Sequence, residues 1–467
     1  MKRFNIKRSF KGLFFLSILL TGVLFFSTSC NDNQSSNPPT NGYTNDSFPG
    51  MIVWIKPGST RADLNNWLNN NVKGLGPIDT AAYCSTCDNS LILLKGQGPD
   101  LFLQHQTASG GGGSTGNPLT GDDGPIYYSY NFEFPYTDAI DSSEIPPSAK
   151  IKFGKAYTDS VTVAVFDSGI DSTLISYNRF FYISSSPSCI VNSAATTGWN
   201  FSANPTNGFW EDDFNQRHGT KVSALIIGQV NALGGTGVKL LPIKIVTKAG
   251  TGNLFNALCG FSYAANRGAK IINASFGYYA PDKHDPAGLG TSYATLFKAF
   301  IQKYLTQNNI LLVAAAGNTT PDENIRNLDK VAFYPASFAG DPDLPNVIAV
   351  TTVFEDPITH NATVSGTQNF SANVVDIGVN ADVMPNYLFS NPFRTSHTLN
   401  GSSFAAPVAT GQICANYHLL LNAAGAFQAN RAAVLNMLNA QHLIHTNAAL
   451  TGFIRGQNIM IKRPANN

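Results

Sequence analysis

The stretch VTVAVFD at residues 161–167 is an almost unbroken run of apolar and β-branched residues that ends in an aspartate. Such a run is typical of a strand that is buried on both faces. The pattern recurs in KLLPIKIV (239–246), AKIINASFG (269–277), NILLVAAAGN (309–318) and NVIAVTTV (346–353), with helical patterns such as TKVSALIIG (220–228) between the runs. Apolar strands that alternate with helices predict an α/β fold, in which a mostly parallel sheet carries helices on both faces.

Polar residues stand at the carboxyl ends of these strands, where parallel sheets bind their ligands. Asp167 ends the first strand, Asn318 ends another, and His218 begins a helical stretch. Ser403 lies at the start of an apolar helical pattern in NGSSFAAPVATG (400–411). Singly, such an aspartate is often a turn former and such a serine is most often a helix cap. Together they offer a carboxylate, an imidazole, a hydroxyl and an amide donor, which are the groups that acyl transfer needs.

The order and local context of these residues resemble the subtilisin-like serine proteases, or subtilases. That family carries the motifs D-[ST]-G, H-G-T, A-A-G-N and G-T-S-M-A-x-P in this order. The matching residues here are Asp167-Ser168-Gly169, His218-Gly219-Thr220, Ala315-Ala316-Gly317-Asn318 and Gly401-Ser402-Ser403-Phe404-Ala405-Ala406-Pro407. The resemblance implies a subtilisin-like catalytic domain over residues 150–467. It also implies a triad of Asp167, His218 and Ser403, with Asn318 as the side-chain donor to the oxyanion.

The same resemblance implies where a peptide substrate binds. Ser275-Phe276-Gly277 matches the family's strand that lines the primary specificity pocket, and Gly250 and Gly252 match the opposite edge. Ala316 and Gly317 complete the expected substrate-binding residues. An extended peptide would add as a strand between the two edges.

Ser402 replaces the threonine of the family motif, and three further residues near the expected catalytic groups depart from the family pattern. Lys221 replaces the second histidine of H-G-T-H, Phe404 replaces methionine, and Arg217 replaces the glycine that usually precedes the histidine. We expect Arg217 to crowd or charge one side of the cleft.

Residues 51–106 predict a small α+β domain. MIVWIKPG (51–58) has a strand pattern, residues 59–74 have the apolar spacing and the start and stop signals of a helix, and two further strands follow. This β-α-β-β unit is about half of a ferredoxin-like fold. In the family, such a domain is an inhibitory propeptide that assists folding and is normally cut off. Residues 107–149 contain a glycine-rich run and are predicted to be a linker and lead-in to the catalytic domain.

The N-terminus predicts export. Five basic residues precede the apolar run GLFFLSILLTGVLFF (12–26), which is typical of a secretory signal peptide over residues 1–29 and is short for a membrane-spanning helix. The sequence STSC before the cut resembles a bacterial lipoprotein signal, in which Cys30 is lipidated. The polar residues 30–50 are predicted to be a disordered tether. We therefore expect a bacterial cell-surface lipoprotein or an extracellular protein, attached to a membrane only through this lipid.

The six cysteines and the charge limit the remaining possibilities. Cys84 and Cys87 form a CSTC pair between two predicted strands, which favours a local disulfide over a redox motif. A zinc site would need a second pair of closely spaced cysteines, and the sequence has none. The pairing of Cys189, Cys259 and Cys414 is left open. The net charge is +1 without a basic stripe, so we expect no nucleic-acid partner. We also expect a monomer that requires no cofactor and no metal; the family often binds structural calcium, but no clear calcium motif is present.

These observations predict an exported serine endopeptidase that acts on peptides or proteins and is inhibited by its own propeptide. The alternative is a catalytically silent surface binding protein on a subtilase scaffold. An esterase of the α/β-hydrolase type is excluded, because that fold needs G-x-S-x-G and the order serine, acid, histidine.

Overall fold

The computed structural model describes residues 50–84, 87–108, 122–135, 159–175, 177–184, 189, 197–203, 206–279, 294–318, 326–380 and 401–461. All of them lie in one compact unit that begins at Pro38. The expected signal peptide, Cys30 and the expected tether up to residue 49 lie outside the described residues. Within the ranges given, no helix combines the length and the apolar character that a membrane crossing requires.

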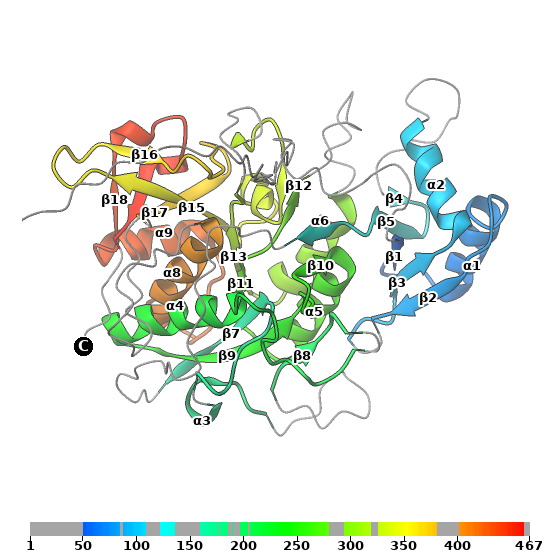
Figure 1. Ribbon diagram of the computed structural model, residues 1–467, viewed down its shortest axis with the longest axis horizontal. Helices are drawn as coiled ribbons and strands as arrows, with labels where there is room; N and C mark the ends of the chain where they lie inside the picture. The colour runs from blue at the N-terminus through cyan, green and yellow to red at the C-terminus, as the bar shows by residue number, and fades with distance from the viewer. Residues whose placement is uncertain are drawn as a thin grey trace, which may run out of the picture. The chain divides into compact units, whose positions relative to one another are not determined.

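The main domain, residues 159–461, is built on a ten-stranded sheet (Figure 1). Its strand order is β18-β19-β17-β15-β13-β11-β7-β9-β8, with β16 paired to β15. Most neighbouring strands are parallel, and only β15–β16 and β18–β19 are antiparallel. The central strands are β9 (Gly237–Lys244), β7 (Ser160–Asp167), β11 (Ile271–Ala274), β13 (Leu311–Ala315), β15 (Val347–Glu355) and β17 (Val375–Asn380). The five apolar runs of the sequence all form strands, which confirms the predicted α/β fold.

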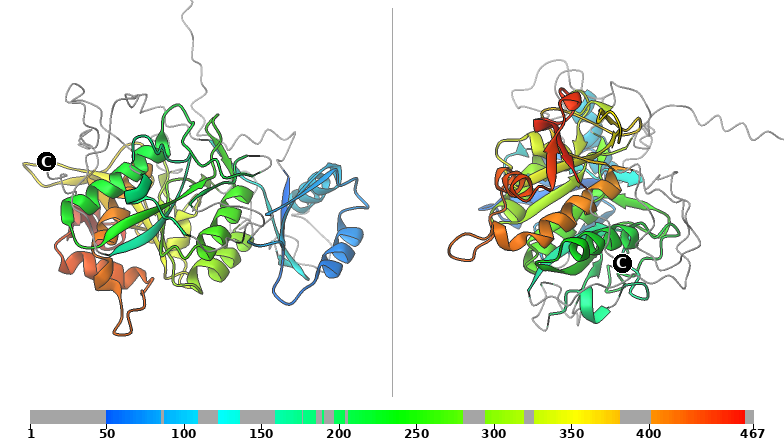
Figure 2. Two further views of the ribbon diagram at one scale, coloured as in Figure 1. Left: turned by 90° about the horizontal axis from the view of Figure 1, so that it is seen from below. Right: turned by 90° about the vertical axis from the view of Figure 1, so that its left-hand side faces the viewer.

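Helices cover both faces of this sheet because successive strand residues point to opposite sides. Val163 and Val165 of β7 pack in one apolar cluster with α4 (His218–Leu233) and α8 (Ser402–Ala415). Ala164 and Phe166 pack in the other cluster, with α5 (Leu254–Asn266) and α6 (Thr295–Ile301). Figure 2 shows the green helix α4 beside the orange helix α8.

Short elements complete the main domain. They are α3 (Tyr177–Phe180), β8 (Trp199–Asn200), β10 (Thr251–Asn253), β12 (Tyr278–Tyr279), η3 (Gln302–Thr306), β14 (Phe333–Tyr334), η4 (Ala336–Gly340), β16 (Ala362–Val364), η5 (Tyr417–Leu420), α9 (Arg431–Ala440), β18 (Ile444–Thr446), η6 (Ala448–Leu450), η7 (Arg455–Gln457) and β19 (Asn458–Met460). The β12–β14 pair and the β10–β6 pair lie outside the large sheet.

The N-terminal domain, residues 50–135, has its own antiparallel sheet in the order β2-β3-β1-β5-β4. Its elements are β1 (Met51–Ile55), α1 (Arg61–Asn71), β2 (Thr80–Tyr83), β3 (Leu91–Lys95), α2 (Gln97–Ala108), β4 (Asp122–Asp123), β5 (Ile126–Tyr130) and β6 (Glu133–Pro135). As the start signal predicts, Thr60 and Asp63 form a reciprocal capping box at the start of α1.

The expected end of this domain at residue 106 is too early. β5 pairs along its whole length with β1, so the sheet is a complete ferredoxin-like arrangement and not half of one. Residues 122–135, predicted as linker and lead-in, therefore contain three strands, β4, β5 and β6. The strand sequence IYYSY is short and stands directly after the polar, glycine-rich run, which hides it from a pattern search.

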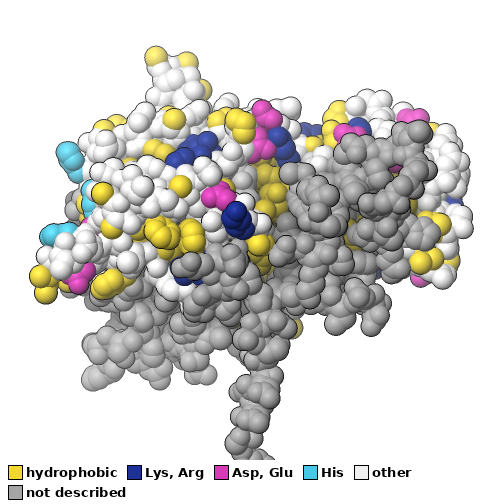
Figure 3. Space-filling view, turned by 90° about the horizontal axis from the view of Figure 1, so that it is seen from above, with side chains coloured by type: hydrophobic (Ala, Val, Ile, Leu, Met, Phe, Trp, Pro, Cys, Tyr) yellow, Lys and Arg dark blue, Asp and Glu magenta, His cyan; other side chains and the backbone are white. Residues whose placement is uncertain are grey.

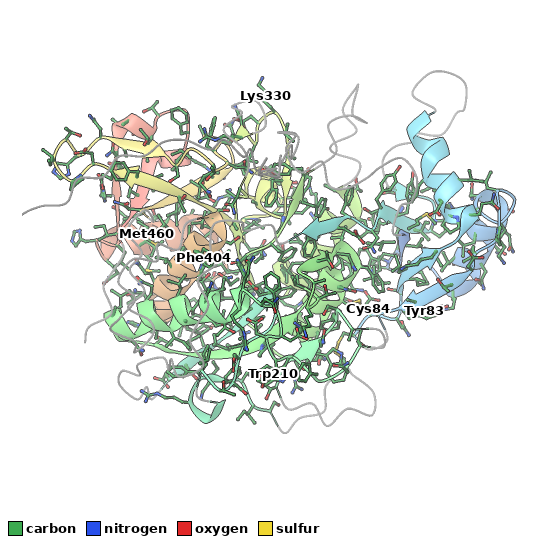
Figure 4. The ribbon with its side chains drawn as sticks, in the orientation of Figure 1. Tyr83, Cys84, Trp210, Lys330, Phe404 and Met460 are labelled. Carbon is green, nitrogen blue, oxygen red and sulfur yellow. A yellow bond between two sulfur atoms is a disulfide. The ribbon has the colours of Figure 1, made fainter. Side chains whose placement is uncertain are left out.

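The predicted disulfide between Cys84 and Cys87 is wrong. Cys84, at the end of β2, is bonded to Cys259 in α5, and Cys87 is bonded to Cys189. The Cα atoms are 5.5 Å and 4.9 Å apart, inside the usual range for a disulfide. The prediction rested on the CSTC segment alone, whereas the fold brings the end of β2 against α5; Figure 4 labels Cys84 at this junction. Among the described cysteines, Cys414 is buried and free.

The two domains share one apolar cluster. Trp54 of β1 lies with its ring 5.1 Å from Phe300 of α6, and Phe132 stacks on Tyr278 at 4.4 Å. Trp54 and Phe132 are each 1% exposed. The N-terminal domain therefore packs its sheet against the main domain, which shields these side chains from water.

Asp88 is the polar centre of this contact. Its carboxylate accepts hydrogen bonds from Trp54 Nε1 at 2.9 Å and from the Tyr304 hydroxyl at 2.5 Å, and lies 3.3 Å from Lys303 Nζ. Burial alone would raise the pKa of Asp88, but the hydrogen bonds of Ser90 and Tyr304 and the Lys303 charge outweigh it and hold the pKa below its ordinary value. The ionised form thus stabilises the contact between the domains.

We expect Asp88→Asn to lower the free energy of unfolding by about 1.5–3 kcal/mol at neutral pH, the usual range for a hydrogen bond to a charged group. A lowered pKa contributes stability above the unfolded-state value, so the difference from wild type should shrink below about pH 4. Urea unfolding in a Ser403→Ala background measures both effects. Asp343→Asn is the control, because its side chain is 64% exposed, and a similar loss there would contradict the assignment.

Candidate active site

The acid and the base of the expected triad are in contact. Asp167 is the last residue of β7 and His218 is the first residue of α4. His218 Nδ1 lies 2.9 Å from both carboxylate oxygens of Asp167, and the side chains are 1% and 0% exposed. The Ser168 amide donates to Asp167 Oδ1 at 2.7 Å and fixes the carboxylate. In this arrangement the carboxylate holds the proton on Nδ1, which leaves Nε2 as the basic nitrogen.

Ser403 is the second residue of α8, and the residue that follows it contacts His218. The ring of the next residue, Phe404, is 5.0 Å from the imidazole of His218, and Figure 4 labels Phe404 at the start of the orange helix. The Ser403 hydroxyl donates to the Ser275 carbonyl at 3.4 Å, and the Ser275 hydroxyl donates to the Ser403 carbonyl at 2.7 Å. Neither serine of the pair is the helix cap, because the cap position is Gly401, with a φ of 121°. That positive φ favours glycine.

The side chain of Asn318 is held in one orientation by Ser402. Asn318 Oδ1 accepts hydrogen bonds from the Ser402 amide at 2.9 Å and from the Ser402 hydroxyl at 3.0 Å. With its oxygen engaged there, the amide nitrogen Nδ2 lies toward Gly401, 3.2 Å from the point that a Cβ of residue 401 would occupy. Asn318 therefore presents an N–H donor next to the residue that precedes Ser402 and Ser403.

Gln368 is a member of this site that the sequence did not reveal. Its side-chain oxygen accepts a hydrogen bond from the Ser402 amide at 2.7 Å, and the residue is 1% exposed. Ser402 in turn accepts a hydrogen bond from the Gly317 amide at 2.9 Å. Gln368 stands in the polar run SGTQNFS (365–371), which has no spacing that could have indicated the contact.

A buried polar network lies beneath the Asp167–His218 pair. Asp212 is 2% exposed and accepts hydrogen bonds from Ser168 Oγ at 2.9 Å, Thr220 Oγ1 at 2.7 Å and the Thr220 amide at 3.0 Å. Burial raises the pKa of Asp212 to about 6, and the charge of Asp167 adds to this, although the hydrogen bonds of Thr220 act in the opposite direction. Asp212 lies between Asp167 and His218 in the chain, in the segment WEDD (210–213), whose composition alone gives it no role.

Lys244 supports the same region from the neighbouring strand. It lies opposite Asp167 in the register of β7 and β9 and is 1% exposed. Its Nζ donates a hydrogen bond to the Ser168 carbonyl, and a second one, 2.8 Å long, to Asp213 Oδ1. A buried cation thus fixes the turn that follows the catalytic strand.

The chain's own β6 occupies the expected substrate-binding edge. β6 pairs antiparallel with β10, with Phe134 opposite Gly252. The Phe134 ring takes the space next to Gly252, since a Cβ there would lie 2.0 Å from it, and it lies 4.9 Å from the ring of Phe276. The Phe134 side chain therefore lies against both predicted substrate-binding edges, at Gly252 and at Phe276.

The other expected substrate-binding residues have little or no side chain and are fixed through their backbone. Gly277 has no room for a side chain, because a Cβ would lie 2.3 Å from Phe333. Ala316 donates to the Val350 carbonyl at 2.8 Å and accepts from Asn369 Nδ2 at 2.8 Å. Gly317 and Gly250 have φ values of 95° and 83°, which favour glycine.

The departures from the motif pattern have separate structural roles. Arg217 has a φ of 52° and its guanidinium is paired with the carboxylate of Asp171. The expected charge beside the cleft is thus partly neutralised. Lys221 is 2% exposed. The described residues contain no group of three or more histidine, cysteine, aspartate or glutamate side chains that could hold a metal ion.

Several known proteins are similar in sequence to this chain. The sequence model of the subtilase family matches residues 158–453. Subtilisin Savinase of Lederbergia lenta is 28% identical over 198 residues, which cover 42% of this chain and 60% of that protein. The cell wall-associated protease of Bacillus subtilis is 29% identical over 160 residues, or 32% of this chain and 16% of that protein. Subtilisin-like protease 3 of Plasmodium falciparum is 27% identical over 207 residues, or 42% and 24% of the two chains.

A solved structure shows the same fold. The epidermin leader peptide processing serine protease of Staphylococcus aureus is 16% identical, with a TM-score of 0.50 over 88% of this chain and 96% of that chain. The matches to the Plasmodium and Bacillus relatives span only 24% and 16% of their length. The family match, however, covers more than half of the chain and contains all four motif regions. The chain belongs to the subtilase family.

Proposed function

We propose that this protein is a secreted or surface-anchored serine endopeptidase that hydrolyses peptide bonds through an acyl-enzyme. The observation that carries the proposal is the buried contact of His218 Nδ1 with Asp167 at 2.9 Å, next to the start of the helix that holds Ser403. A buried imidazole fixed by a carboxylate is the base that a serine nucleophile needs.

The reaction follows from the roles of these groups. Ser403 Oγ turns from the Ser275 carbonyl toward His218 Nε2, gives up its proton there and attacks the scissile carbonyl carbon. Asp167 holds the imidazole and stabilises its charged form. His218 then gives the proton to the leaving amine, and the acyl group stays on Ser403. Water attacks the ester with His218 as base, which releases the acid and restores the serine.

The oxyanion is stabilised by two kinds of donor. Asn318 Nδ2 is directed by the two hydrogen bonds that Ser402 makes to the oxygen of the same amide. The Ser403 backbone N–H lies in the first turn of α8, where amides have no partner within the helix and the helix dipole favours negative charge. These groups are in place before the charge develops, so little reorganisation is needed during the reaction.

We propose that β6 inhibits the uncut chain. Because Phe134 already occupies the space beside Gly252 and Phe276, a substrate strand has to displace β6 to bind the same edge. Cleavage of the chain among the residues that follow Pro135 would free the end of this segment. The N-terminal domain thus acts as a propeptide, and the protein is made as a zymogen.

Export is supported by the disulfides as well as by the signal pattern. Two disulfides with sequence separations of 175 and 102 residues require an oxidising compartment. One relative is named a cell wall-associated protease. We propose a bacterial extracellular or cell-surface location, with lipidated Cys30 as the membrane attachment. We also propose a monomer that requires no cofactor and no metal. On the face in Figure 3, cationic and anionic side chains lie singly or in mixed groups. This distribution supports the proposal that the protein does not bind nucleic acid, which would need a basic patch.

A silent binding protein on the same scaffold is the second candidate. It is favoured only by Arg217 and by the segment VVDIGVNADVMP (374–385), in which the A-P-G that the family normally carries before the serine region is blurred, and neither belongs to the four chemical positions. The following labelling experiment distinguishes the two candidates.

We expect a fluorophosphonate probe to label the chain at Ser403 after self-processing, because only an activated hydroxyl reacts with it. Peptide mass spectrometry locates the adduct. Ser403→Ala should abolish labelling, whereas the adjacent Ser402→Ala should keep the adduct on Ser403 at a lower rate. A folded wild type that stays unlabelled, even after a trace of added protease has cut the segment that follows Pro135, would favour the binding protein.

We expect Asn318→Ala to lower kcat for a peptide substrate by about 100–1,000-fold, the range known for loss of one oxyanion-hole donor in subtilisin itself. KM should change little, because the amide acts on the developing charge, and the variant should stay folded at the assay temperature although it loses the two hydrogen bonds from Ser402. Asn439→Ala, on the exposed surface of α9, is the control. Undiminished kcat in Asn318→Ala would remove this residue from the mechanism.

We expect Asp212 to reduce stability as the pH rises from about 4 to about 6. A carboxyl group whose pKa is raised on folding holds more protons in the folded state than in the unfolded state, so its ionisation in this window favours unfolding. In a Ser403→Ala background, Asp212→Asn should therefore gain stability relative to wild type across this window, by up to about 3 kcal/mol. Asp376, with a similarly raised pKa, titrates in both proteins and cancels. Parallel pH profiles of the two proteins would exclude the shift.

A further inference from the structure

We propose that processing does not release the N-terminal domain, and that the mature enzyme is a two-chain protein held together by the disulfides Cys84–Cys259 and Cys87–Cys189. The inference rests on the proposed self-processing for the cut itself. The propeptide of the family is normally cut off, so retention is a property of this chain and its own cysteines.

The positions of the four cysteines make the link independent of the exact cut. Cys84 and Cys87 lie in the N-terminal domain, and Cys189 and Cys259 lie in the main domain. Any single cut between residues 88 and 188 leaves both bonds joining the two products. The segment after Pro135, where β6 leaves the substrate edge, falls inside this interval.

The surface between the domains is also built for permanent contact. Trp54 and Phe132 of the N-terminal domain pack against Phe300 and Tyr278, and all four side chains are at most 1% exposed. Departure of the domain would expose these large aromatic side chains together. Contiguous apolar surface of this kind is rare on free soluble proteins.

The start of α5 depends on the same domain for hydrogen bonds. The Leu254 amide donates to the Phe132 carbonyl at 2.8 Å, and the Phe255 amide donates to Asn131 Oδ1 at 2.9 Å. These are amides of the first helical turn, which have no partner inside the helix. The N-terminal domain therefore accepts hydrogen bonds from the start of the helix that carries Cys259, in addition to forming the disulfide.

Retention has a consequence for location and for activity. With a lipid on Cys30, the catalytic domain stays at the membrane after the cut, because the disulfides replace the broken peptide bond. The strand β6 also stays close to β10 after the cut, because only Asn131 and Phe132 separate it from β5, which remains in the sheet of the N-terminal domain. The freed end thus remains at a high local concentration beside the substrate edge, which reaches the millimolar range for short connections.

The test is electrophoresis in dodecyl sulfate of the chain from Asp32 onward, blocked with N-ethylmaleimide after processing and run with and without reductant. We expect one full-length band without reductant and two bands with it, the smaller ending after Pro135. Ser403→Ala should give one band in both lanes, and Cys414→Ala should behave as wild type. Two bands without reductant would overturn the proposal.

Failure of processing is distinguished from failure of the link. If the reduced wild type shows a single band, self-processing is refuted, and the link is tested on Ser403→Ala cut by a trace of added protease between residues 136 and 158. Peptide mapping of either sample should find Cys84 joined to Cys259 and Cys87 joined to Cys189. A peptide with Cys84 joined to Cys87 overturns the proposal.

Discussion

The contact between Asp167 and His218 is the constraint on which the site depends. A carboxylate and an imidazole are both removed from water here, so each has to satisfy the other. The fold achieves this by ending β7 and beginning α4 at the same place, with the Ser168 amide, Thr220 and Asp212 fixing the surrounding turn. The parallel sheet supplies this meeting point, because the ends of its strands converge on one edge.

The rest of the site is arranged by backbone amides at glycine positions. Gly401 and Gly317 both adopt positive φ, and between them they bring Ser402 against Asn318. Ser402 is therefore the link that orients the amide of Asn318, while Gln368 holds the Ser402 amide from the other side. A serine at this position keeps the hydroxyl that makes the contact, so the departure from the family's threonine preserves the chemistry.

Sequence patterns predicted the elements that depend on local composition. The apolar strands, the helix α4, the helix α1 with its start signal and the four motifs all follow from residues close together in the chain. The features that were missed depend on contacts between distant segments. Cys84 finds Cys259 across 175 residues, Gln368 reaches Ser402 across 34 residues, and β5 is recognised as a strand only beside β1. No periodicity carries that information.

The same long-range contacts set how the enzyme would become active. An inhibitor that binds through β6 alone would dissociate once its chain was cut. Here β6 continues from β5, whose sheet is joined to α5 by Cys84 and packed against the main domain through Phe132. Cleavage therefore frees the end of β6 but leaves the N-terminal domain attached to the main domain. On this proposal activity is a competition at Gly252 between the retained segment and a substrate strand, and it is decided by the affinity of the substrate and not by loss of the inhibitor.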